Sequence, residues 1–208
     1  MPLILALAGL LLSPAAEFVI ARTLPRLGGL PSLRVRITTA AVTALLFGLL
    51  AWRFGMAAEL PAFLLLALLG VQLSRIDFTF HLLPNPLVLL LLGGGLALLL
   101  ASAALAPGWP EMLRALAGGL ILFVGYLILG LISPGALGMG DVKLAAPLGM
   151  YLGYLGWQQV LFGGLLGFVV GGVLTVLMLR LRSAEKPAET AHGPAMVIAT
   201  LGIILALN

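Results

Sequence analysis

Charged side chains are scarce in this sequence. Of its 208 residues, 9% are Asp, Glu, Lys or Arg, whereas an ordinary soluble domain has roughly 25%. Hydrophobic residues make up 62% of the chain, and the mean hydropathy is +1.22. So little polar surface cannot cover a soluble globule. The composition therefore excludes a soluble domain and predicts a protein that lies largely in lipid.

Cysteine is absent. This absence excludes disulfide bonds, thiolate zinc sites and cysteine nucleophiles. Histidine occurs only twice, and the 11 basic residues are spread thinly along the chain. A nucleic-acid surface needs Lys and Arg clustered on a polar face. We therefore expect no metal site and no nucleic-acid partner.

Apolar runs of near-membrane length recur along the whole chain. A helix needs roughly 20 residues to cross the hydrocarbon core of a bilayer. The runs therefore predict an all-α, polytopic membrane protein with about eight spans, in one domain over residues 1–208. The predicted spans are 3–21, 37–53, 60–76, 86–106, 112–132, 142–157, 159–179 and 194–208.

The basic residues predict the orientation of these spans. Nine of the eleven fall on one side of the predicted bilayer, and two, Arg53 and Arg114, fall on the other. By the positive-inside rule the side with nine is cytoplasmic, which puts both termini outside. The nine are Arg22, Arg26, Arg34, Arg36, Arg75, Lys143, Arg180, Arg182 and Lys186.

Three of the seven acidic residues stand out by position. Four acids lie in predicted loops, where solvated carboxylates are ordinary. Glu17, Asp77 and Asp141 instead lie at the cytoplasmic edge of a predicted span. An ionisable group at such a place is either interfacial or functional.

Asp141 lies directly before an apolar run. Asp is a favoured N-cap residue, so a purely structural role is one interpretation. However, Ala145, Gly149 and Gly153 follow on the same helical stripe. A carboxylate above a stripe of small residues faces a closely packed helix and not lipid. Lys143 points away from Asp141 on this helix and is expected to extend toward the lipid headgroups.

Asp77 lies in the segment between the third and fourth predicted spans. In a purely structural interpretation, Asp77 is a neighbour of Arg75 in a wet hairpin. His81 lies four residues further on and could reach Asp77 if the helix continues. The fourth span is expected to begin with Asn85 as N-cap and Pro86 at the first helical position.

Two aspartates at one membrane depth on different helices can act together. If both reach one water molecule, like-charge repulsion keeps one protonated while the other is ionised. The ionised carboxylate can then take a proton from water as the water attacks a peptide carbonyl, and the protonated one can donate to the carbonyl oxygen. Asp77 and Asp141 are thus candidates for an aspartyl protease pair, and the proton belongs to the pair.

The residues around both aspartates resemble a known family. The run from Gly138 through Gly140, Asp141 and Lys143 to Ala146 is similar to the GxGD signature of the type IV prepilin peptidases, which are polytopic aspartyl proteases. The second aspartate of that family precedes a Leu-Pro-Asn turn, as Asp77 precedes Leu83-Pro84-Asn85.

Weaker similarities extend to both ends of the chain, at Phe18–Pro25 and Gly193–Met196. The resemblance implies that Asp77 and Asp141 are catalytic, and that the glycines, Lys143 and the Pro84-Asn85 turn support them.

The chain departs from the family pattern in two places. Many members carry a cytoplasmic zinc domain with cysteine pairs between spans one and two, and also N-methylate the new terminus with S-adenosylmethionine. Here that loop is only about Arg22 to Arg36 and has no cysteine, so it cannot build such a module. No cofactor is expected, but the use of S-adenosylmethionine by this chain for methylation stays open. Glu17 stands where an Asn is expected, and its role stays open as well.

The resemblance implies a multi-pass enzyme of the cytoplasmic membrane that removes the short leader of prepilin-like substrates at the cytoplasmic face. The substrate's own hydrophobic helix would lie in the bilayer. A proton-coupled or ion-coupled transporter is the alternative from another class. Charges near the midplane and repeated halves, which are typical of transporters, are not seen in the sequence. A catalytically silent assembly partner of the same fold is the third hypothesis.

Overall fold

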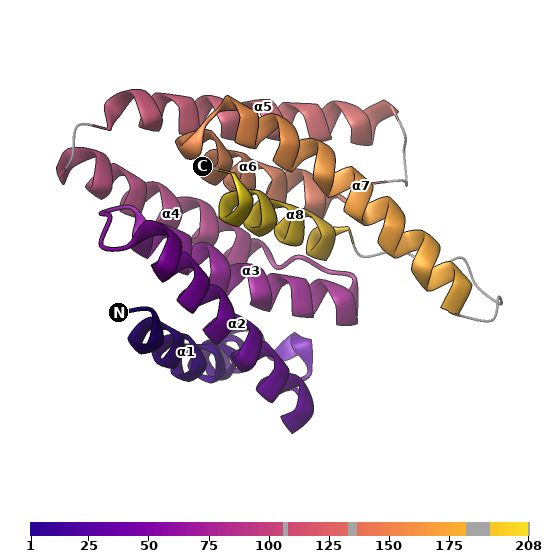
Figure 1. The fold of residues 1–208 in the computed structure, drawn as a ribbon. Coiled ribbons are helices and arrows are strands. Elements are labelled where there is room, and N and C mark those ends of the chain that lie inside the picture. The colour runs from indigo at the N-terminus through magenta and orange to yellow at the C-terminus, as the bar shows by residue number, and fades with distance from the viewer. Residues whose placement is uncertain (106–107, 133–136, 182–191, 208) are drawn as a thin grey trace.

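The computed structural model describes residues 1–105, 108–132, 137–181 and 192–207, and these residues form helices without a strand (Figure 1). The eight α-helices confirm the predicted all-α, polytopic architecture. They are α1 (Pro2–Thr23), α2 (Leu33–Phe54), α3 (Leu60–Phe80), α4 (Asn85–Leu105), α5 (Trp109–Ile132), α6 (Met139–Leu155), α7 (Trp157–Leu181) and α8 (Gly193–Ala206). A short 3₁₀ helix, η1 (Pro25–Leu27), follows α1.

Five of the helices, α1 to α5, are long and apolar enough to cross a membrane. α6 has 17 residues and α8 has 14, which gives lengths of about 26 and 21 Å at 1.5 Å per residue. Both are shorter than a hydrocarbon core of about 30 Å. The side chains of α7 are described as far as Val173, and residues 182–191, including the basic Arg182 and Lys186, lie outside the described part.

The helices run side by side, with α1 and α2 at one edge of the bundle and α5 at the other (Figure 1). α6 is the central helix: it contacts α4, α5, α7 and α8, and most of its residues are buried. A helix that is apolar on all sides and flanked by neighbours belongs in the interior of a bundle.

The glycine stripe of α6 lies against α5, as the sequence predicts. A Cβ atom on Gly153 would come within 3.1 Å of the Ala115 Cα atom, and one on Gly149 would overlap the Gly118 carbonyl oxygen. Only residues without a side chain allow two helix backbones to approach this closely. This contact fixes α6 along α5 and so sets the depth of the α6 N-terminus.

Two arginines hold the ends of the short helices at the far side of the bundle. Arg114 on α5 donates to the carbonyl oxygens of Gly153 and Tyr154 at the end of α6, both at 2.8 Å. Arg53 on α2 donates to the carbonyl oxygen of Ile204 at the end of α8. Such donors satisfy carbonyls that have no partner within the helix. The N-termini of α6 and α8 therefore both lie at the opposite end of the bundle.

Candidate active site

Asp77 lies in the last turn of α3 and is buried, with 5% of its surface exposed. Its Oδ2 atom accepts a hydrogen bond from the backbone N–H of Gly193, the first residue of α8, at 3.1 Å. A Cβ atom at position 193 would lie 2.8 Å from this oxygen. A glycine is therefore needed for α8 to approach the carboxyl group so closely.

The wet-hairpin interpretation of Asp77 is wrong. α3 continues to Phe80, four residues past the predicted end of the span, so Asp77 is helical and buried. Arg75 points elsewhere, because its Nε atom donates to Gln72 Oε1 at 3.2 Å. His81 ends the helix in the left-handed conformation, with φ of 49°, and its N–H donates to the Asp77 carbonyl oxygen at 2.8 Å.

Asp141 is the third residue of α6 and not its N-cap, so the capping interpretation is wrong in that detail. The N-cap position is held by Gly138, whose backbone N–H donates to Asp141 Oδ2 at 3.3 Å. Asp141 is also buried, with 7% of its surface exposed. The backbone N–H groups of the first turn of α6, which have no partner within the helix, lie beside this carboxyl group.

The turn at Leu83–Asn85 packs beside the two aspartates. Leu83 is buried, and a Cβ atom at Gly140 or at Gly193 would lie within 3.1 or 3.3 Å of its side chain. This turn therefore contacts the N-termini of both α6 and α8.

Two expectations for this turn need correction. Asn85 is the first residue of α4 rather than its N-cap, because the Pro84 carbonyl oxygen already accepts the first helical hydrogen bonds. The Asn85 Oδ1 atom instead accepts a hydrogen bond from Lys143 Nζ at 3.1 Å. Lys143 thus ties α6 to α4, and does not merely extend toward headgroups.

Both aspartates line one cavity of about 410 Å³ at this end of the bundle. They lie close enough to interact electrostatically, although the two aspartates are 64 residues apart in the sequence. In the described residues, the only hydrogen bonds to either carboxyl group come from backbone N–H groups. Two carboxyl groups that line one cavity and reach the same water molecule can divide the roles of general acid and general base.

Residues of the short loop after α1 form part of the cavity wall, which the sequence analysis did not anticipate. Leu24 and Leu27 are buried there, and Arg26 is exposed at the rim. The local sequence around η1, Leu24-Pro25-Arg26-Leu27, has no pattern that indicates this position. The hydrogen bond from the Gly193 N–H was also not predicted, because every residue except proline has a backbone N–H and the sequence does not show which of them donates to a side chain.

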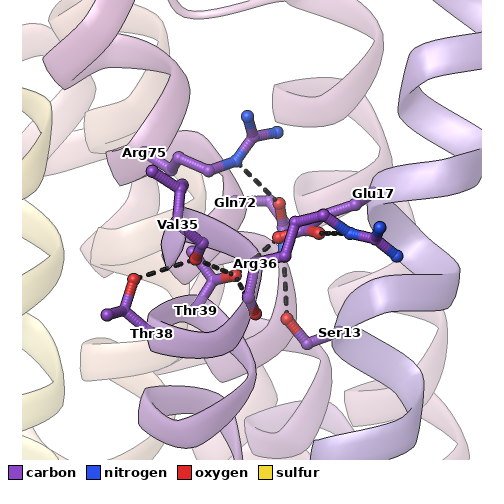
Figure 2. Close-up of polar contacts among 8 residues, drawn as sticks. All are labelled: Ser13, Glu17, Val35, Arg36, Thr38, Thr39, Gln72 and Arg75. Atoms are coloured by element: carbon purple, nitrogen blue, oxygen red, sulfur yellow. Dashed lines mark hydrogen bonds and ion pairs between the residues drawn. The ribbon is translucent and has the colours of Figure 1, made fainter. Parts of the chain in front are cut away.

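Glu17, the third acid at this depth, belongs to a different environment (Figure 2). It is 1% exposed on α1, accepts a hydrogen bond from Thr39 Oγ1 at 2.5 Å, and forms an ion pair with Arg36 Nε at 3.4 Å. Beside it, Gln72 Nε2 on α3 donates to Ser13 Oγ at 3.2 Å. Glu17 thus joins α1 to α2 and does not line the aspartate cavity.

Metal ligands do not gather at this site. Over the described ranges, no group of three or more His, Asp or Glu side chains is placed to hold a metal ion.

Comparisons with known proteins agree with the resemblance read from the motifs. The type IV leader peptidase family matches residues 60–176. The chain is 38% identical over 157 residues to a prepilin leader peptidase/N-methyltransferase of Stutzerimonas stutzeri, covering 74% of this chain and 53% of that protein. It is 39% identical over 162 residues to the protein of the same name from Pseudomonas aeruginosa, covering 76% and 53%.

A third relative, from Dickeya chrysanthemi, is 35% identical over 168 residues, which cover 80% of this chain and 57% of that protein. The chain spans about half the length of the curated relatives it matches. No solved structure matches it significantly. The family match covers more than half of the chain, from α3 into α7, and includes both aspartates, so the chain belongs to the type IV leader peptidase family.

Proposed function

We propose that this protein is a membrane aspartyl endopeptidase that removes the short leader peptide of prepilin-like substrates. The observation that carries the proposal is the pairing of Asp77 on α3 with Asp141 on α6 in one cavity. Family membership and the names of the relatives support the reaction. Neither favours the alternative of a transporter.

The chemistry needs one proton on the pair. The ionised carboxyl group takes a proton from a water molecule as the water oxygen attacks the scissile carbonyl carbon, and the protonated carboxyl group donates its proton to the carbonyl oxygen. The C–N bond of the tetrahedral intermediate then breaks: the amine leaves with a proton from the pair, and a hydroxyl group of the former carbonyl carbon returns a proton to the pair. This yields a free leader carboxylate and a new N-terminus.

The supporting residues hold the two carboxyl groups in place. Backbone N–H groups of Gly138 and Gly193 fix one oxygen of each aspartate, and both aspartates line the cavity. Lys143 and Asn85 hold the Leu83–Asn85 turn against α6. A geometry fixed by backbone groups and packing loses little orientational freedom when substrate binds.

We place the aspartate end at the cytoplasmic face of the cytoplasmic membrane, with both chain termini on the other side. Arg26 and Lys143 line the aspartate cavity, whereas Arg53 and Arg114 lie at the far end of the bundle. This distribution supports the orientation predicted by the positive-inside rule. The substrate would then be cut beside the inner surface of the bilayer, after a glycine, as the family resemblance implies.

The test is cleavage of a prepilin precursor by the purified protein in phospholipid vesicles, followed by mass spectrometry of both products. We expect one cut at the end of the leader, and no cut by the Asp141→Asn variant purified in the same way. An intact precursor with the wild-type protein, or an equal yield of product with the variant, would contradict the proposal.

A further inference from the structure

An apolar groove runs along the membrane-facing surface between α4 and α5. The two helices contact each other little, and α6 lies behind both. Two adjoining hollows of about 320 and 340 Å³ share the lining residues Leu92, Phe123 and Ala146. We call the combined surface the α4–α5 groove; Leu92 belongs to its α4 wall, Phe123 to its α5 wall and Ala146 to its floor.

This groove continues into the aspartate cavity. Asn85 and Lys143 line its end and also line the cavity that holds Asp77 and Asp141. The surface therefore changes from apolar in the groove to polar at the carboxyl groups. An occupant that suits both parts is an apolar segment followed by a polar, unwound one.

We propose that the α4–α5 groove binds the apolar transmembrane helix of the substrate, and so places the bond before that helix at the two aspartates. This inference rests on the proposed function. An apolar segment within a bilayer must be helical to satisfy its backbone groups. The bond that is cut must lie outside the helix, because its carbonyl carbon has to be open to water.

The groove is open to lipid along its length. Leu89 on α4 and Leu120 on α5 are 64% and 63% exposed at its two sides. A substrate helix can therefore enter sideways from the bilayer. No opening of the bundle is required.

A second groove, similar in size to each of the two hollows, provides a matched control. It lies between α5 and α7, has a volume of about 360 Å³, and is lined by Gly125 and Leu161 among other apolar residues. Within the described part of the chain it shares no lining residue with the aspartate cavity. It faces lipid in the same way without leading to the carboxyl groups.

The first experiment compares Ala146→Phe with Gly125→Phe. Ala146 is only partly buried on the groove floor, and a Cβ atom at Gly125 would meet nothing within 4 Å, so each ring fills one groove. We expect Ala146→Phe to lower cleavage of a full-length precursor by about tenfold or more, since tenfold needs only roughly 1.4 kcal/mol.

A short soluble peptide that ends a few residues after the cut should be cleaved by Ala146→Phe at a rate near that of the wild type. Gly125→Phe should change neither rate appreciably. Unimpaired cleavage of the full-length precursor by Ala146→Phe, or an equal loss with Gly125→Phe, would overturn the proposal.

A second measurement detects binding without cleavage. Because the chain has no cysteine, Leu120→Cys and Leu161→Cys can each be made in an Asp141→Asn background, and each can be oxidised with a precursor that carries one cysteine in its apolar helix. We expect a disulfide with Leu120→Cys and none with Leu161→Cys. A disulfide with Leu161→Cys and none with Leu120→Cys would overturn the proposal. So would the absence of a cross-link at either position, which is the result expected if lipid alone fills the groove. Cross-linking at Leu120→Cys together with an inactive wild-type enzyme would instead contradict the proposed function.

Discussion

Two regions at the same end of the bundle bury carboxyl groups in opposite ways. Glu17 is surrounded by side chains that neutralise and bind it, since Arg36 pairs with one of its oxygens and Thr39 donates to the other. In the described residues, Asp77 and Asp141 receive hydrogen bonds only from backbone N–H groups, and each faces the cavity.

The difference shows that burial alone does not identify a functional acid. A buried carboxylate that is held by a guanidinium and a hydroxyl partner serves to join the helices that carry these groups. A carboxylate that meets only backbone donors, a second carboxylate and open space can gain and lose a proton. We therefore propose a structural role for Glu17 and a catalytic role for the two aspartates.

The largest effect should follow from neutralising either aspartate. Asp77→Asn and Asp141→Asn each keep the side-chain volume but remove a group that can accept or deliver a proton. We expect cleavage to fall by about 10²- to 10⁴-fold or more in each variant, the range for general acid and base groups. Initial rates from precursor cleavage, with thermal unfolding in detergent as the control for folding, give the measurement. Near-normal cleavage by either variant would return that aspartate to a structural role.

Gly193→Ala should produce the next largest effect. The new Cβ atom would lie 2.8 Å from Asp77 Oδ2 and would force α8 away from the carboxyl group. We expect cleavage to fall by about tenfold, which corresponds to roughly 1.4 kcal/mol. Gly202→Ala on the same helix is the matched control, because a Cβ atom there meets nothing within 4 Å. Equal rates for the two variants would show that the Gly193 contact is unimportant.

Glu17→Gln should separate the two regions most clearly. It leaves Arg36 without its ion-pair partner, so we expect a loss of about 1–3 kcal/mol in stability, measured as a lower midpoint of thermal unfolding in detergent. Cleavage at a temperature where the protein stays folded should change by less than about threefold, which is roughly 0.6 kcal/mol. A large loss of cleavage with unchanged unfolding would move Glu17 into the catalytic machinery.

No effect is expected from metal chelation. The chain has no cysteine, and a structural zinc site needs four ligands held together. Precursor cleavage in the presence of a strong chelator should equal that without it, and the mature product should lack an N-terminal methyl group when S-adenosylmethionine is supplied. Loss of activity with the chelator would reveal a metal requirement. A methylated product would point to the membrane helices as a methyl-transfer site, with Glu17 the first residue to test.

The sequence predicted the helices better than it predicted their ends. Apolar runs located all eight, because lipid demands continuous hydrophobic stretches. α2 begins at Leu33 and not at the predicted residue 37. The prediction was late because Arg34 and Arg36 look like loop charges in the sequence, whereas Arg36 lies in the helix and pairs with Glu17. α3 extends past the predicted 76 because the polar Asp77 and Thr79 belong to its last turn.

For the site, too, the sequence predicted the residues better than it predicted the contacts between them. The motifs identified both aspartates as candidates, and the glycine stripe of α6 indicated a close helix contact. The Gly193 N–H, the loop wall at Leu24 and the bond from Lys143 to Asn85 depend on segments far apart in the chain. Such contacts are set by tertiary packing, which local patterns do not contain.

The double variant Asp77→Asn/Asp141→Asn tests the central claim most directly. If the two carboxyl groups act as one unit, removing the second should cost little once the first is gone. Precursor cleavage rates for the wild type, both single variants and the double variant, measured in the same vesicles, give the coupling between the two positions. We predict that the double variant is within about threefold of the slower single variant. Losses that multiply, so that the double variant falls by the product of the two single losses, would contradict the account.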